Sequence, residues 1–226
     1  SMLTMSHPLD NIALLPHVLT MDYDVIISGG GLTGIILALA LDQTGISTAI
    51  IDKNTPLVAT NNIFDGRSYA ISAASQKMLN MLGLWKNLAK NAQPMLEIKV
   101  SDGYAGEVPS PFVMQFDRQD FTEGPMGYMI EDRHLRQVLQ GALKYSKVKF
   151  QSNTQVLSQT VQPTHVAAKL NSGATITAAV LVGADGRTSN TAKTAGLTRS
   201  GWDYGQSSLV CVIAHEKPHN GIAHQY

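Results

Sequence analysis

Residues 23–34, YDVIISGGGLTG, join a short apolar run to a glycine-rich turn. The run Tyr23–Ser28 is rich in β-branched residues and predicts a buried strand. The next six residues fit the pattern G-x-G-x-x-G. Residues 32–42 then predict a helix that is apolar on almost every side and therefore buried. A second apolar run, residues 47–51, predicts another buried strand, so about 30 residues form a βαβ unit with parallel strands.

Each glycine of this pattern has its own expected role. Gly29 permits the tight turn, Gly31 lets the backbone approach a pyrophosphate, and Gly34 lets the helix pack close to the strand. The helix N-terminus then offers free N–H groups to phosphates. Asp52 ends the second strand, and its carboxylate can accept both hydroxyls of an adenosine ribose while repelling a 2′-phosphate. The glycines predict an adenine dinucleotide site but do not separate NAD from FAD. A tight turn in another kind of α/β protein is the alternative.

Composition limits the function classes. The 226 residues contain 17 basic and 17 acidic side chains, and this zero net charge argues against a nucleic-acid binder held by phosphate neutralisation. The single cysteine excludes an intramolecular disulfide and a four-thiolate zinc site, and the seven histidines lack ligand spacing, so no metal site is predicted. No apolar run approaches the ~20 residues that cross a bilayer. We expect a cytoplasmic protein, soluble or peripheral to a membrane.

The rest of the chain alternates helical and strand patterns. The helical spacing of Ala74, Met78, Met81 and Trp85 predicts a second helix, with Gly83 as its stop. A third helix is predicted around residues 135–142, with loops and short strands over residues 102–127. Asn171-Ser172-Gly173 predicts a hairpin turn. Further strands are predicted at residues 96–100, 148–150, 154–159, 165–170, 174–177, 179–183 and 207–214.

These elements predict an α/β fold, namely a Rossmann-like FAD/NAD(P)-binding domain with an inserted β-meander plus part of a mostly β substrate domain. We expect the chain to be truncated at its C-terminus, because it stops soon after the strand predicted at 207–214. The expected division is a tail of residues 1–21, a discontinuous nucleotide-binding domain of residues 22–101 and 128–198, and part of a mostly β domain of residues 102–127 and 199–226.

Three further residues are candidates for cofactor binding. Arg67 precedes the second helix and Arg133 opens the third, and each could donate bidentate bonds to an anionic cofactor. Asp185 follows a buried strand, at the position where open α/β sheets bind ligands. Taken singly, each has an ordinary structural explanation as a surface arginine or an Asp-Gly turn. Their order along the chain favours a function.

That order resembles the class A flavoprotein monooxygenases, the FAD-dependent aromatic hydroxylases. Segments 65–72, 100–102, 127–135 and 183–187 are similar to the ubiquinone-biosynthesis hydroxylases, nearest to the type that acts on 2-octaprenyl-6-methoxyphenol. The resemblance implies an enzyme that uses FAD, NAD(P)H as a transient co-substrate, and O2 to hydroxylate a prenylated phenol. It makes the discontinuous domain of residues 22–101 and 128–198 the FAD-binding domain, and residues 102–127 and 199–226 a partial substrate domain. It also implies that FAD is bound by Gly29, Gly31, Leu32, Thr33, Gly34, Asp52, Lys53, Arg67, Arg133, Val156 and Asp185.

The larger of two departures from the family pattern is an absence. The family has a later Gly-Asp motif on the flavin side, and no Gly-Asp pair occurs in this chain. We therefore expect weak FAD retention and no turnover by these 226 residues, and we nominate no catalytic side chain. An FAD-dependent dehydrogenase or oxidase of the same fold and a non-catalytic nucleotide-binding module are the alternatives. Peripheral association with the inner membrane or with a ubiquinone-synthesis complex is a further expectation, and the oligomeric state is open.

Overall fold

The computed structural model describes residues 20–55, 64–103, 110, 112–120 and 124–225. A six-stranded sheet in the order β8-β2-β1-β11-β10-β9 forms its centre. The four strands from β8 to β11 are parallel, and β11, β10 and β9 form an antiparallel meander. The strands are β1 (Tyr23–Ser28), β2 (Thr48–Ile51), β8 (Lys149–Gln151), β9 (Val156–Val161), β10 (Val166–Leu170) and β11 (Thr175–Gly183).

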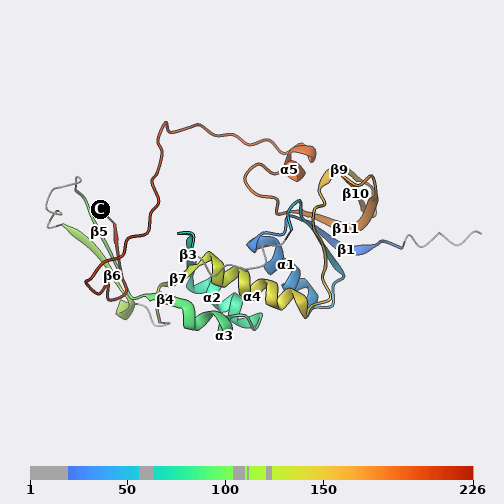
Figure 1. Ribbon diagram of the computed structural model, residues 1–226. Helices are drawn as coiled ribbons and strands as arrows, with labels where there is room; N and C mark the ends of the chain where they lie inside the picture. Colours follow the sequence, from blue (N-terminus) through green and yellow to red (C-terminus); the bar gives the residue numbers. More distant parts are fainter. Residues whose placement is uncertain (1–19, 56–63, 104–109, 111, 121–123, 226) are drawn as a thin grey trace, which may run out of the picture.

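The two faces of the parallel strands are covered by different elements. Ile27 and Ile50 pack against α1 (Leu32–Gln43) and α4 (Asp132–Lys144), which lie side by side on one face (Figure 1). Ile26 points to the opposite face because side chains alternate along a strand. There it packs in a second core with the meander, whose fully or nearly buried side chains are Val156, Ala168 and Leu170. The predicted βαβ unit and meander are therefore confirmed.

The sequence did not predict a second, three-stranded sheet, in the order β3-β7-β4. It is antiparallel and lies beside two short helices, where Trp85 meets Tyr128 edge-on at 4.7 Å between ring centroids. The second predicted helix stops before Gly83, as expected, where φ is 72°, and Trp85 begins a separate helix. The elements are β3 (Ser68–Ser72), α2 (Ala73–Met81), α3 (Trp85–Leu88), the 3₁₀ turn Ala89–Asn91, β4 (Ala92–Met95) and β7 (Gly127–Glu131).

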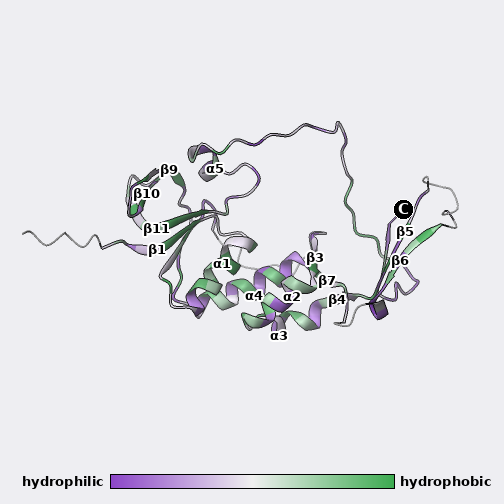
Figure 2. Cartoon of the chain, turned by 180° about the vertical axis from the view of Figure 1, so that it is seen from behind, coloured by the Kyte–Doolittle hydropathy of each residue, from purple (hydrophilic) through white to green (hydrophobic). Residues whose placement is uncertain are grey.

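A third sheet, β12-β5-β6, has one apolar face. Residues that pair across neighbouring strands share a face of the sheet. On the apolar face, one row across the strands contains Phe116, Ile98 and Ala223, and the adjacent row contains Met114 and Val100. Met114 is 61% exposed and Phe116 is 40% exposed, and Figure 2 colours much of β6 as hydrophobic. The strands are β5 (Glu97–Ser101), β6 (Val113–Asp117) and β12 (Ile222–Gln225), and the 3₁₀ turn Arg118–Asp120 follows β6.

Two strand predictions were wrong. The strand expected at 207–214 is absent: these residues have no regular secondary structure, and Cys211, which its strand pattern predicts to be buried, is exposed. They belong to the long connection from α5 (Asn190–Thr194) to β12 (Figure 1). A strand needs a neighbour for its backbone groups, and no described segment pairs with this one. The strands expected at 174–177 and 179–183 form the single strand β11. Its first half pairs with β10 and its second half with β1, and Ala178 pairs with both, so the strand is continuous.

Among the residues that the structure describes, no helix is both long enough and apolar enough to span a bilayer.

Candidate nucleotide-binding site

The glycine-rich turn connects the carboxyl end of β1 to the N-terminus of α1, and at Gly29 and Gly34 backbone atoms leave no space for a side chain. Gly29 has φ of +111°, and a Cβ there would overlap the carbonyl group of Ala184. A Cβ on Gly34 would overlap the carbonyl oxygen of Gly29 and approach Ile27 to 3.4 Å. The tight turn at Gly29 and the close helix packing at Gly34 are therefore as predicted.

Gly31 differs from both. Its φ of −75° is open to any residue, and no atom outside its immediate neighbours lies within 4 Å of the position that a Cβ would take. It lines two cavities, one on each side of the turn. A glycine here leaves room in front of the first turn of α1 that a side chain would fill. This is the space that a phosphate group needs to reach the N–H groups of a helix N-terminus.

Asp52, just after β2, ties the turn to the second strand. Its Oδ2 accepts a hydrogen bond from the Gly30 N–H at 2.5 Å, and its Oδ1 accepts one from the Asn54 N–H at 2.7 Å. These bonds fix the carboxylate at the edge of both cavities. Because each oxygen carries two lone pairs, the carboxylate keeps acceptor capacity for a pair of ribose hydroxyls.

The two cavities have volumes of about 490 Å³ and 270 Å³, and they share Gly31, Asp52 and Asn54. The larger one lies toward α4, and its other lining residues are Gly30, Leu32, Ile35, Thr55, Arg136, Gln140 and Phe150. The smaller one lies toward the meander and the end of β11. Its other lining residues are Ser28, Gly29, Ile51, Lys53, Thr154, Gln155, Val156, Ala184, Asp185, Gly186, Thr188 and Asn190.

Asp185 lines the smaller cavity, but its carboxylate also holds its own loop together. Oδ1 accepts a hydrogen bond from the Ser189 hydroxyl, and Oδ2 accepts bonds from the backbone N–H and the hydroxyl of Thr191, both at 3.0 Å. Burial alone would raise the pKa of Asp185, but these bonds outweigh it and hold that pKa below its ordinary value. The carboxylate therefore anchors the start of α5.

The structure does not bring Arg67 and Arg133 to either cavity. Arg67 pairs with Asp65 at 2.6 Å, and the hydrogen bond between them raises the pKa of Arg67 and lowers that of Asp65. Arg133 donates from Nε to Glu131 at 2.5 Å, and its guanidinium lies over the ring of Phe64. Thr33 is in the first turn of α1 and does not line the cavities either.

The residues that α4 contributes to the site were not predicted from the sequence. Asp132, Arg136 and Gln140 recur every four residues, and Arg136 and Gln140 line the larger cavity while Leu135 and Leu139 are buried in the core. A polar stripe at helical spacing beside the apolar stripe was the available signal. Its direction toward the glycine-rich turn depends on how α4 packs against α1.

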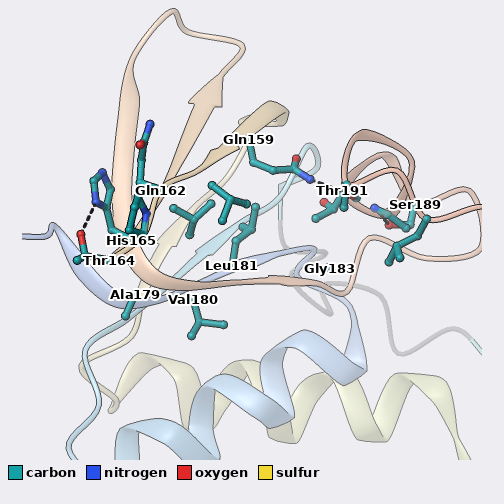
Figure 3. A pocket seen from close by; sticks show the side chains of 16 residues that line it. Gln159, Gln162, Thr164, His165, Ala179, Val180, Leu181, Gly183, Ser189 and Thr191 are labelled. Carbon is teal, nitrogen blue, oxygen red and sulfur yellow. Dashed lines mark hydrogen bonds between the residues drawn. The ribbon is translucent and has the colours of Figure 1, made fainter.

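A third cavity, of about 500 Å³, lies beside β11 and the meander, away from the glycine-rich turn (Figure 3). Gln159 reaches from β9 and donates to the Thr191 carbonyl in α5 at 3.0 Å, and Thr164 and His165 lie at the opposite end. No described residue forms part of a cluster of three or more His, Cys, Asp or Glu side chains that could hold a metal.

The chain was compared with known proteins. A family model described as an FAD binding domain matches residues 22–224. Ubiquinone hydroxylase UbiL of Rhodospirillum rubrum is 37% identical over 203 residues, covering 88% of this chain and 46% of that protein. The 3-demethoxyubiquinol 3-hydroxylase of Escherichia coli is 30% identical over 197 residues, covering 85% of this chain and 49% of that protein.

The fold is also found in a solved structure, p-nitrophenol 4-monooxygenase PnpA from Pseudomonas putida. The TM-score is 0.65 at 20% identity, over 80% of this chain and 45% of that one. The chain thus spans about half the length of the curated relatives it matches. Since the family model covers almost all of the described residues, with the glycine-rich turn and Asp52 among them, the chain belongs to the FAD-binding domain family.

Proposed function

We propose that the parent protein is an FAD-dependent monooxygenase that hydroxylates a prenylated phenol in ubiquinone biosynthesis, with NAD(P)H and O2 as co-substrates. The match to the FAD binding domain over residues 22–224 carries this proposal. The names of the two relatives, a ubiquinone hydroxylase and a demethoxyubiquinol hydroxylase, support the substrate class. When bound, FAD would accept electrons from NAD(P)H and activate O2.

In this proposal the described residues hold the adenosine diphosphate half of FAD. The diphosphate lies in front of Gly31 at the N-terminus of α1, and Asp52 accepts the ribose hydroxyls. Lys53, Val156 and Asp185 line the smaller cavity, where the adenosine would lie. Leu32 lines the larger cavity, and Thr33 and Gly34 complete the first turn of the helix.

The residues fit the proposed cofactor on two observations. The open space in front of Gly31 accepts a phosphate that a Cβ would exclude. The Asp52 carboxylate is fixed by two backbone N–H groups at the rim of both cavities, so it is already oriented before a ligand arrives. Arg67 and Arg133 remain proposed contacts. Both are now bonded to carboxylates, and each would need to redirect part of its guanidinium toward the cofactor.

The division into domains is also a proposal. β6 comes from residues 102–127 and β12 from residues 199–226, the two segments assigned to a substrate domain, and they lie on either side of β5. β5 itself comes from the segment of residues 22–101 assigned to the FAD-binding domain. We propose that β6 and β12 are the part of the substrate domain present in the chain and that β5 joins them to the FAD-binding domain. A prenylated phenol is a largely apolar substrate, which supports a cytoplasmic enzyme peripheral to the inner membrane or within a ubiquinone-synthesis complex.

A second function, a nucleotide-binding module without catalysis, describes the 226 residues themselves. The observation that favours it is that the chain aligns with only 46% and 49% of the lengths of the two relatives. On this proposal the chain binds ADP and, more weakly, FAD, but does not hydroxylate. A purified chain that carries reducible FAD and consumes NAD(P)H would contradict the module.

The test of the main proposal uses the parent protein with a prenylated phenol and isotopically labelled O2. Label in the phenolic product, together with NAD(P)H consumption that depends on the phenol, is the expected result. NAD(P)H oxidation without labelled product would instead support an FAD-dependent oxidase or dehydrogenase of the same fold.

A further inference from the structure

Asp132 is a buried carboxylate at the start of α4, only 2% exposed. Its Oδ1 accepts a hydrogen bond from the Tyr69 hydroxyl at 2.9 Å. Its Oδ2 accepts one from Arg136 Nε at 2.6 Å and lies 3.3 Å from a terminal nitrogen of Arg67. Two segments that are far apart in the chain, residues 67–69 and 132–136, therefore meet at one side chain.

The position of this carboxylate is fixed by the backbone as well. The Asp132 N–H donates to the Arg67 carbonyl at 2.9 Å, where β3 and β7 pair. Burial and the hydrogen bond to Asp132 both raise the pKa of Tyr69, so its hydroxyl stays protonated and continues to donate. A charge buried at this depth is stable only with such partners, and it can orient them in return.

Arg136 connects this buried carboxylate to the candidate site. It lies one turn after Asp132 on α4 and lines the larger cavity together with Gly31 and Asp52. A guanidinium has five N–H donors in a planar fork, and the bond from Nε to Asp132 uses one edge of that fork. Fixing that edge determines the plane of the guanidinium and the direction of its terminal nitrogens.

We propose that Asp132 is a positioning residue that holds Arg136 toward the diphosphate of an adenine dinucleotide bound at the glycine-rich turn. The identity of the ligand rests on the proposed function. Asp132 itself does not touch the ligand, because it lines neither cavity. It acts through the Nε bond, and its effect is therefore specific to the phosphate end of the ligand.

The proposal predicts the direction in which Asp132→Asn changes the affinity for an anion. Removing a carboxylate makes the surroundings more positive, so simple charge balance predicts that Asp132→Asn tightens the binding of an anion. Positioning predicts the opposite, because Arg136 loses its fixed orientation. The expected loss for one charge-assisted hydrogen bond is roughly 10- to 100-fold in affinity.

The test is calorimetric titration of the 226-residue chain with ADP and with adenosine. Asp132→Asn should weaken ADP binding by roughly 10- to 100-fold and leave adenosine binding within about twofold. Tyr69→Phe is the matched control: it disturbs the same buried cluster and leaves both arginine contacts, so ADP binding should stay within about twofold. Arg136→Lys, which keeps the charge but lacks the Nε–H, should weaken ADP binding like Asp132→Asn even if the latter variant fails to fold.

Several results would overturn the proposal. Tighter ADP binding by Asp132→Asn would assign the carboxylate to charge balance. An equal loss of ADP affinity in Tyr69→Phe would assign the effect of Asp132 to the stability of the buried cluster. Unchanged ADP binding by Arg136→Lys would show that the orientation of the Arg136 guanidinium does not affect binding. If the unchanged chain binds no ADP, both this proposal and the proposed function fail. If it binds ADP and the variants do not weaken it, only this proposal fails.

Discussion

Gly31 and Gly34 lie three residues apart, and replacing each with alanine should affect different properties: Gly34→Ala should lower stability, and Gly31→Ala should weaken nucleotide binding. Gly34→Ala places a methyl group on the carbonyl oxygen of Gly29, a backbone atom that cannot rotate away. Overpacking costs typically 1–3 kcal/mol, and the upper part of that range applies here. The better helix propensity of alanine returns about 1 kcal/mol. We expect a net loss of about 2 kcal/mol, or roughly 4–8 °C in Tm for a chain of this size.

Gly31→Ala should leave the fold almost unchanged. Its φ of −75° suits alanine, no atom outside the adjacent residues lies within 4 Å of the new methyl group, and the loss of a glycine N-cap costs under about 1 kcal/mol. The methyl group would instead stand in the cavity, in the space proposed for a phosphate. ADP binding should weaken at least about tenfold, which is about 1.4 kcal/mol.

Thermal melting followed by circular dichroism and calorimetric titration with ADP measure the two effects separately. Gly34→Ala should lower Tm more than Gly31→Ala does. At a temperature where both variants are folded, Gly31→Ala should lose more ADP affinity relative to its loss of Tm than Gly34→Ala does. ADP binding by Gly31→Ala within about twofold of the unchanged chain would refute the reasoning about the cavity. A Tm for Gly34→Ala equal to that of the unchanged chain would refute the reasoning about packing.

Three further changes test other parts of the structure. Leu139→Ala empties a fully buried position and should cost about 2–5 kcal/mol in urea unfolding, whereas Met81→Ala, at 77% exposure, should cost under about 0.5 kcal/mol; similar losses would contradict the assigned core. Because the pKa of Asp185 in the folded protein is lower than its ordinary value of 3.8, the ionised carboxylate stabilises the fold at pH values above 3.8, and this contribution is lost as pH falls through the folded pKa. The loss of unfolding free energy in Asp185→Asn should therefore be largest at neutral pH and shrink as pH falls below 3.8; a loss that stays constant with pH would contradict this. Met114→Ser and Phe116→Ser together should reduce self-association in light scattering without lowering Tm, and unchanged scattering would show that the apolar face of β6 does not drive association.

The βαβ unit could be predicted from the sequence because its signals are local. Tyr23–Ser28 is apolar and β-branched, the glycines follow at once, and each residue agrees with its neighbours. The hairpin at Gly173 was predictable for the same reason, and the glycine has the positive φ of 89° that such a turn favours. In both cases the residues that determine the structure lie within a few positions of one another.

The β3-β7-β4 sheet could not be predicted in this way. Tyr69 pairs with Ile130, about sixty residues later, and neither short strand has a pattern that stands out alone. The error at 207–214 has the opposite origin. There the pattern of a strand is present, but pairing depends on a partner that the described residues do not provide. Strand formation is thus a property of two segments, and a pattern in one segment reports only half of it.

The candidate site was only partly predictable for a related reason. Asp52 follows from its position after a strand, whereas Arg136 enters through the packing of α4 against α1, which no local spacing encodes. Arg67 and Arg133 were chosen as cation donors, and the structure shows both beside carboxylates from their own neighbourhood. The sequence identifies which residues can bind an anion, and tertiary structure decides which of them face it.

The central position of β1 has a consequence for the synthesis of the protein. β1 is paired on one side with β2 and on the other with β11, whose Ala178 lies opposite Tyr23. At roughly 5–20 residues per second, about 8–30 seconds of translation separate the two strands. Throughout that interval one edge of the strand that holds Ile26 and Ile27 has no partner within the nascent chain, and the loop around Asp185 that completes the smaller cavity does not yet exist. A nucleotide can therefore be enclosed only after most of these residues have been synthesised, and until then the growing chain depends on other means to protect the buried side chains of β1.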